Sequence, residues 1–533
     1  MDETPRRLAL PALKATLILL CLVTPSLWMI ANIPPLWRDA DAYTQLTQDP
    51  LIATYWGHAP AYCHLSKIPL FLGKLLERTQ PGMGLVANAD RLWLPLTDTG
   101  ISILIITQHL ALDVAVFLFI CAVNKRFWVR LVLAAIWASN ALFYTFAHCV
   151  GSESLGMILI VFLAWRGLRL VQTRREPTWK EWYAYAAILV VCILARDLNL
   201  VLLGLLPATF LIAWTFACVG RHPMVRQHLR HAVIAIALGV ACLAIANAIP
   251  RGLAHKTRLQ PHSRIGFTFL WRLHSINALA PEARTALLQR VSARAPSGPV
   301  RDLIALLGQM HAQRTDAWDS QPFMQRAIDF FGGPPHWKEL DHGLNQMAFA
   351  FLWPPTPEIL SAARGDFMAA MRLPSTVISG YLFATTSYYF SHRSEMPACA
   401  NLVTFRGMNA DKIEEIKVSY GYFRWWQKVS YGEALVLWIL TLLLVTVLAR
   451  RRPEAGIIFS FAFSLAGAGL AIFAVTCLLH NYELRFGLTM WQTLILSWCI
   501  LVGQIFFQES PPGSCLPRTI GAAESRVKTP ADS

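Results

Sequence analysis

The sequence predicts an all-α polytopic membrane protein, and three observations lead to that fold class. The chain has 533 residues, of which 55% are hydrophobic and only 15% charged, whereas a soluble protein carries about 25% charged residues. Apolar runs recur along it, and their lengths cluster near the ~20 residues that a helix needs to cross a hydrocarbon layer of ~30 Å. Basic residues gather in short clusters between these runs, as the positive-inside rule requires.

We expect about ten transmembrane helices. The first follows Arg6 and Arg7 and is too long for the core of a signal peptide, so it is expected to remain as an uncleaved span. The other spans follow from the apolar runs in chain order. The expected spans are 11–33, 101–123, 128–148, 152–171, 182–196, 197–219, 230–249, 432–450, 455–478 and 486–507.

The fifth and sixth spans come from dividing one apolar stretch at Arg196-Asp197. Undivided, the stretch 182–220 is far too long for one span, even a tilted one. The division also keeps the basic connections, including the triple arginine 450–452, on one side of the membrane. The even number of spans that results places both termini in the cytoplasm.

Two extracytoplasmic loops are expected to be large, and they define the predicted parts of the chain. The second loop is too long for a plain connection and is expected to hold short helices, because apolar residues have helical spacing in 281–295, 300–313 and 358–371. The predicted parts are a transmembrane module 1–250 with a first loop at 34–100, the second loop 251–431, the last spans within 432–508 and a disordered cytoplasmic tail 509–533.

The formal net charge of +15 does not indicate nucleic-acid binding, because no contiguous basic groove or aromatic ladder accompanies it. Most of the eleven cysteines lie inside apolar runs, and no Cys/His spacing is typical of a zinc site. Cys63 and Cys399 fall in the two expected outer loops. They are either a disulfide pair or two unrelated thiols.

The first candidate for chemistry comes directly after the first span, in Trp37-Arg38-Asp39-Ala40-Asp41-Ala42-Tyr43. Two carboxylates two residues apart, beside an arginine and close to the membrane, have the chemistry of a general base or a metal clamp. The alternative is a solvated loop with ordinary acidic residues.

Two further segments follow, Tyr55-Trp56-Gly57-His58-Ala59-Pro60 and Ser66-Lys67-Ile68-Pro69-Leu70. With the acidic segment, they resemble the GT-C superfamily of membrane glycosyltransferases, above all the protein O-mannosyltransferases, the lipid A aminoarabinose transferases and the bacterial polyprenyl-phosphate-sugar transferases. In those families, the first outer loop begins with an acidic motif and runs through a His/Pro segment to a Lys-Pro-Pro-Leu-like element. The resemblance is residue-specific over positions 37–72 and architectural elsewhere.

The resemblance implies that Asp39 or Asp41 is the catalytic base, that Lys67 is the basic residue of the later element and that His58 supports the site. Two departures are visible. The Asp-Glu pair of the mannosyltransferases stands here as Asp39-Ala40-Asp41, so the choice of base stays open. The double proline is reduced to Ile68-Pro69.

Other ionisable residues are expected on the same membrane face. Because placing an ionisable side chain in or near the bilayer costs free energy, such residues suggest a function. Arg196 and Arg485 have the fork geometry that binds a lipid-linked phosphate. Alternatively, they are structural locks that pair with neighbouring carboxylates. The supporting residues at these turns are Glu153, His480 and Glu483, and Asp197 is a second possible partner of Arg196.

His109 and Asp113 lie one turn apart in the second expected span, and this spacing puts them on one helix face. They are either a proton relay or a polar lock, meaning buried polar contacts that hold helices together.

The implied function is the transfer, with inversion, of a sugar from a polyprenyl-phosphate donor to a glycan, lipid or protein acceptor on the outer face of the membrane. No divalent metal is implied, because the donor already carries its phosphate leaving group. A bacterial inner membrane is favoured over the endoplasmic reticulum, because the outer loops contain no Asn-x-Ser/Thr sequon. The competing classes are a transporter or lipid flippase using His109 and Asp113, a glycan polymerase or ligase, and a silent scaffold.

Overall fold

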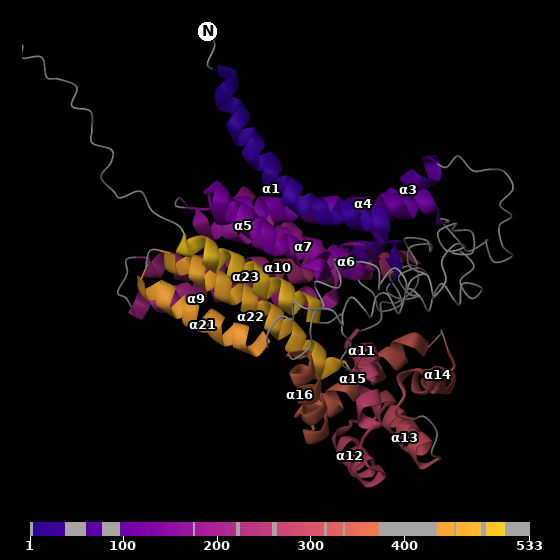
Figure 1. Ribbon diagram of the computed structural model, residues 1–533. Helices are drawn as coiled ribbons and strands as arrows, with labels where there is room; N and C mark the ends of the chain where they lie inside the picture. The colour runs from indigo at the N-terminus through magenta and orange to yellow at the C-terminus, as the bar shows by residue number, and fades with distance from the viewer. Residues whose placement is uncertain are drawn as a thin grey trace, which may run out of the picture.

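The chain is an all-α polytopic membrane protein (Figure 1). The computed structural model describes residues 4–37, 60–76, 96–173, 176–219, 224–257, 264–313, 317–333, 336–371, 434–451, 455–480 and 487–506. Within these residues, seven helices are long and apolar enough to cross a membrane, or eight if one bent helix pair counts as a span. The expected tail 509–533 lies outside them.

The spanning helices follow the predicted apolar runs closely. They are α1 (Thr4–Asn32), α4 (Asp98–Val123), α7 (Ser152–Gln172), α9 (Leu205–Val219) with the 3-10 helix η2 (Asp197–Gly204) before it, α10 (Val225–Thr257), α22 (Gly456–Leu479) and α23 (Gly487–Ile505). Two more expected spans are helical but short. These are α8 (Trp179–Ala195) and α21 (Ala434–Arg451), whose apolar part is Val436–Leu448.

The run 128–148, expected to be one straight span, is a bent pair of helices. α5 (Phe127–Ala138) and α6 (Ala141–Ala147) meet at an angle of 66°. At the bend, the side chains of Ser139 and Asn140 both donate to the carbonyl of Ile136, at 2.8 and 2.7 Å. Such side chains compete with the backbone for helical carbonyls and therefore favour a break there.

The break expected at Arg196-Asp197 is present. α8 ends where Arg196 adopts an extended backbone conformation, with φ −153° and ψ 129°. The Asn199 side chain then donates to the carbonyl of Cys192 at 2.9 Å. This bond satisfies one of the carbonyls that the end of α8 leaves without a helical partner.

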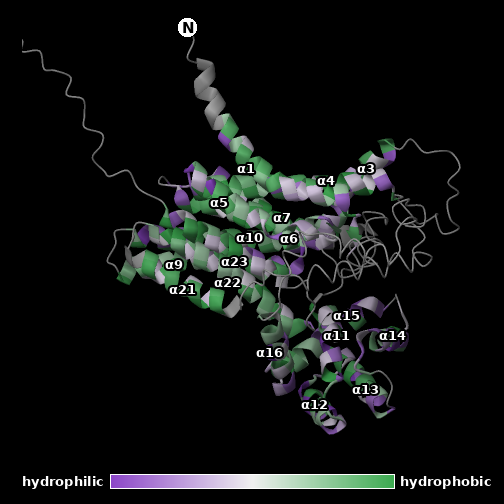
Figure 2. Ribbon diagram, in the orientation of Figure 1, coloured by the Kyte–Doolittle hydropathy of each residue, from purple (hydrophilic) through white to green (hydrophobic). Residues whose placement is uncertain are grey.

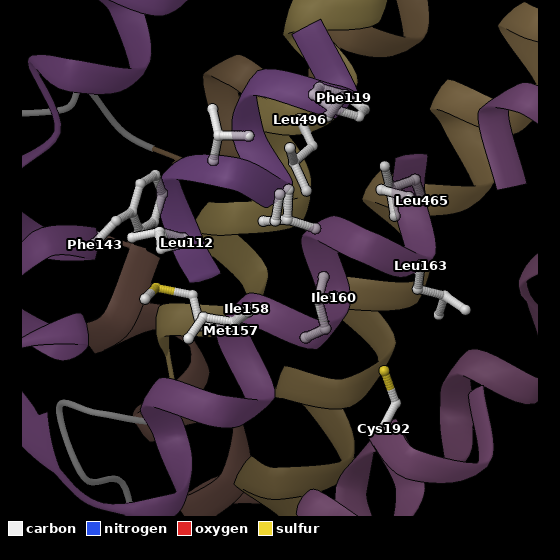
Figure 3. Packing of buried hydrophobic residues seen from close by; sticks show 14 of the residues in the cluster. Leu112, Phe119, Phe143, Met157, Ile158, Ile160, Leu163, Cys192, Leu465 and Leu496 are labelled. Atoms are coloured by element: carbon white, nitrogen blue, oxygen red, sulfur yellow. The ribbon is translucent and has the colours of Figure 1, made fainter. Parts of the chain in front are cut away.

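One large apolar core joins the spanning helices. Figure 3 shows Leu112 and Phe119 of α4 and several residues of α7 packed with side chains of α6, α8, α22 and α23. α3 (Pro60–Leu76) packs on α4 so closely that a Cβ at Gly73 would lie 2.1 Å from the Cα of Gly100. Small residues of this kind let two helix backbones touch.

Six helices between residues 264 and 371 form a second unit with its own apolar core (Figure 1). The three segments predicted to be helical within the second loop are all helical. In Figure 2, this unit mixes hydrophilic and hydrophobic residues, while the bundle is mainly hydrophobic. The helices are α11 (Arg264–Ile276), α12 (Pro281–Arg294), α13 (Pro299–Ala312), α14 (Ser320–Phe331), α15 (Trp337–Leu352) and α16 (Pro357–Met371).

Candidate functional site

The candidate residues are divided between described and undescribed parts of the chain. Lys67, Glu153, Arg196 and His480 are described. The remaining candidates lie outside the described residues, and these are Asp39, Asp41, His58, Glu483 and Arg485. The described residues nearest to these five in the sequence are Trp37, Pro60, His480 and Gly487, and they lie at one end of the bundle.

The end of the first span is held to the start of α7 by a short parallel strand pair. β1 (Leu36–Trp37) pairs with β2 (Cys149–Val150), and the amide of Leu36 donates to the carbonyl of His148 at 3.1 Å. Trp37, only 2% exposed, is two residues before Asp39 in the sequence. The predicted acidic motif therefore begins from a buried and hydrogen-bonded anchor.

Gln108 of α4 organises the polar contacts behind this strand pair. Its Nε2 donates to the carbonyls of Ala147 and Cys149, at 2.9 and 3.1 Å. Its Oε1 accepts from Ser154 at 3.2 Å and from the Tyr62 hydroxyl at 3.4 Å. Sequence reasoning missed Gln108, although an amide inside the apolar run 101–123 was a visible signal.

Tyr62 connects α3 to the same point. Its hydroxyl accepts a hydrogen bond from the amide of Gly151 at 2.9 Å. Since α3 begins at Pro60, two residues after His58, this bond fixes the start of α3 beside the start of α7.

Lys67, the basic residue of the predicted motif, is buried on α3 at 5% exposure. Its charge acts on two neighbours on the same helix. Burial raises the pKa of the Cys63 thiol to about 12, and Lys67 partly opposes this shift. Burial and Lys67 together lower the pKa of His64. Cys63 is a buried thiol, and its possible disulfide partner Cys399 lies outside the described residues.

Glu153 and Arg196 face each other across α7 and the end of α8. Arg196 Nη2 lies 3.8 Å from Glu153 Oε1, with the two side chains 14% and 2% exposed. Glu153 is in the first turn of α7, where the helix dipole stabilises a carboxylate. At Gly156, a Cβ would lie 3.0 Å from Arg196 Cδ, so the arginine side chain crosses α7 at a glycine. The carboxylate pairing expected as the alternative for Arg196 is thus present.

The end of α22 is held by residues of α11 and α16. Arg272, which is fully buried, donates to the carbonyls of Cys477 and His480 and pairs with Asp366 at 2.6 Å. Trp271 stacks on His480, with ring centroids 5.7 Å apart and planes at 16°. Arg272 was not predicted from the sequence, because nothing in its local pattern marks a tertiary contact 205 residues away.

The start of α23 is held to the start of α7. Gln492 Nε2 donates to the carbonyl of Met157 at 2.7 Å. His480 and Gly487 flank the segment that contains Glu483 and Arg485, and they end α22 and begin α23.

His109 is part of a buried chain of hydrogen bonds between helices. Its Nδ1 lies 3.0 Å from Ser26 Oγ, and its Nε2 lies 3.1 Å from His148 Nδ1. His148 Nε2 lies 2.8 Å from the carbonyl of Ile33. A neutral His148 that donates Nε2–H to Ile33 must accept at Nδ1, which makes His109 the donor between them.

This chain of bonds ends at a backbone carbonyl, which does not release a proton. The contacts therefore favour the structural interpretation of His109, a polar lock joining α1, α4 and the segment after α6. Asp113, one turn beyond His109 on α4, is also buried, at 2% exposure.

Within the described ranges, no group of three His, Cys, Asp or Glu residues is placed to hold a metal ion. The amino-acid sequence matches no protein-family model and no curated protein.

Proposed function

We propose that the chain is a membrane glycosyltransferase of the GT-C type, which transfers a sugar from a polyprenyl-phosphate donor to a glycan, lipid or protein acceptor. The proposal includes about ten transmembrane helices with both termini in the cytoplasm. The site then lies on the extracytoplasmic face of the plasma membrane, and we propose that this membrane is a bacterial inner membrane.

One observation carries the proposal. One end of the bundle holds the described residues that are nearest in sequence to the acidic, histidine and arginine candidates, together with two mostly buried cations. Trp37 precedes Asp39, Pro60 follows His58, and His480 and Gly487 flank Arg485. Lys67 and Arg196 are two mostly buried cations at this end, and Arg196 also pairs with Glu153. Both side chains carry the positive charge that pairs with an anionic phosphate ligand.

The proposed mechanism is a single displacement with inversion. Asp39 or Asp41 takes the proton of an acceptor hydroxyl, whose oxygen attacks the anomeric carbon from the face opposite the phosphate. The bond from that carbon to the phosphate oxygen breaks, and the electron pair leaves with the polyprenyl phosphate. Cations at the phosphate stabilise the developing charge, and the candidates are Lys67, Arg196 and Arg485.

The experiment measures transfer from a radiolabelled polyprenyl-phosphate hexose by purified protein in liposomes, with Lys67→Gln compared with Lys74→Gln. Both lysines are on α3, but Lys74 is less buried and outside the predicted motif. Losing a charge-assisted hydrogen bond to phosphate should raise KM for the donor roughly 10- to 100-fold in Lys67→Gln. Lys74→Gln should resemble the wild type. Equal kinetics for the two variants, at equal thermal stability, would remove Lys67 from the donor site.

A further inference from the structure

A second polar site lies at the opposite end of the bundle, where α1 begins and α4 ends. A cavity of about 310 Å³ opens there between α1, α4 and α5. Three cations line it, Lys14, Lys125 and Arg130, together with apolar side chains that include Ile18 and Phe117.

The position of this cavity separates it from the candidate transferase site. α4 has 26 residues and is therefore roughly 39 Å long. Its residue Gln108 accepts a hydrogen bond from Ser154 in the first turn of α7, beside the candidate transferase site, whereas Lys125 follows the last turn of α4. Gln172, the last residue of α7, donates to the carbonyl of Ala122 at 3.1 Å, which places the end of α7 at this second site. The two sites therefore face opposite sides of the membrane.

The charges of the cavity come from separate elements. Arg130 donates to the carbonyls of Cys121 and Asn124 and so caps the end of α4. Capping accounts for Arg130 but not for Lys14, which comes from α1 and lies 5.8 Å from the centroid of the Phe127 ring. No carboxylate is among the lining residues. Three like charges around one small cavity favour an anion inside it.

The surroundings of the cavity point to a lipid. Its volume is at the lower end of the ~300–1,000 Å³ range of small-ligand pockets, which suits a headgroup rather than a whole lipid. α1 exposes Leu13 and Leu17, which flank Lys14 in the sequence and are 56% and 43% exposed. An ammonium group beside exposed leucines suits a phosphate with attached acyl chains. Basic pockets between transmembrane helices bind anionic headgroups in this way.

We propose that this cavity binds the phosphate headgroup of an anionic phospholipid from the leaflet at the start of α1. The lipid joins α1 to the α4–α5 connection through Lys14 and Lys125, and its acyl chains run along α1.

The test is a titration of the purified full chain in detergent, followed by native mass spectrometry that counts bound lipid. The probes are phosphatidylglycerol and phosphatidylcholine with identical acyl chains, and inorganic phosphate. The double variant Lys14→Gln/Lys125→Gln is compared with Lys180→Gln/Arg226→Gln, which removes two exposed cations from the first turns of α8 and α10. Arg130 is left unchanged because it caps α4.

We expect the wild type and the control variant to bind phosphatidylglycerol more tightly than phosphatidylcholine. Lys14→Gln/Lys125→Gln should bind phosphatidylglycerol about 25-fold more weakly, because each lysine contributes roughly a factor of five. Lys14→Arg/Lys125→Arg should restore binding, which separates lost charge from misfolding. The proposal is overturned if the lysine variant binds phosphatidylglycerol as the wild type does, if both lipids bind equally, or if inorganic phosphate alone displaces the lipid at millimolar levels.

Discussion

Single buried polar residues join distant parts of this chain, and Arg272 is the clearest case. Its guanidinium is fully buried and bridges α11 to the last carbonyls of α22 and to Asp366. The residue thus joins the helical unit 264–371 to the transmembrane bundle next to the segment that contains Arg485. Removing it leaves buried carbonyls and a carboxylate without their donor.

Arg272→Gln should lower the free energy of unfolding by about 3 kcal/mol, since it breaks a buried charged network. A matched control is Arg290→Gln. Arg290 pairs with Glu358 between α12 and α16, but its side chain is 41% exposed. An exposed pair is worth less than ~1 kcal/mol. Thermal unfolding in detergent measures both variants. Equal losses of stability in the two variants would show that burial does not increase the contribution of Arg272 to the free energy of unfolding.

At the residue scale, the sequence predicted side chains by their chemistry but not their partners. Glu153 and Arg196 stood out as ionisable residues at the ends of apolar runs, and the structure brings them together. Gln108, Tyr62 and Arg272 were missed, since each acts through tertiary contacts that no local pattern encodes.

The crossing of α3 and α4 is a close backbone contact beside a predicted motif. Gly73 and Gly100 meet backbone to backbone, and α3 contains Tyr62 and Lys67. A methyl group at Gly73 requires the helices to separate.

Gly73→Ala should therefore destabilise the protein by roughly 1–3 kcal/mol, as overpacking does. The control is Gly365→Ala in α16, where an added Cβ meets nothing within 4 Å. Alanine there should be neutral or stabilising, because it favours the helix. Melting temperatures decide the comparison. A Gly73→Ala protein as stable as Gly365→Ala would contradict the close crossing.

Elements with strong periodicity or clear breakers were predictable, and those made by tertiary contact were not. The break at Arg196-Asp197 and the helices α12, α13 and α16 follow from local sequence. The two-residue strands β1 and β2 do not, because their paired residues are 113 positions apart in the sequence and their pairing depends on how α1 and α7 pack. Ser139 and Asn140 could have indicated the bend between α5 and α6, but both lie within a long apolar run that predicted one straight span.

The whole molecule combines an apolar bundle with a helical unit at one end, and its proposed orientation is testable. Alkaline phosphatase fused after residue 313 should be active, because that position is predicted to lie outside the cytoplasm. A green fluorescent protein fused after residue 508 should be fluorescent, because that end is predicted to be cytoplasmic. An inactive phosphatase after 313 would place the helical unit on the other side and remove the proposed site from the outer face.

At the same scale, the composition and the apolar runs sufficed to predict an all-α polytopic protein. The number of spans is harder to predict. α8 and α21 are helical but fall short of the length that seven other helices reach. Whether such a helix crosses the bilayer depends on local thickness and neighbours, which a hydropathy pattern does not contain.

The central claim is that residues at one end of the bundle transfer a sugar, and the direct test is transfer itself. Purified wild type, Asp39→Asn and Asp41→Asn are reconstituted at matched protein levels with a radiolabelled polyprenyl-phosphate hexose and membrane glycan acceptors. We predict transfer by the wild type and a loss of about 10²- to 10⁴-fold in one aspartate variant, as expected for removal of a general base. The other variant should retain most activity. Wild-type protein that transfers no sugar from any polyprenyl donor, or two aspartate variants as active as the wild type, would contradict the account.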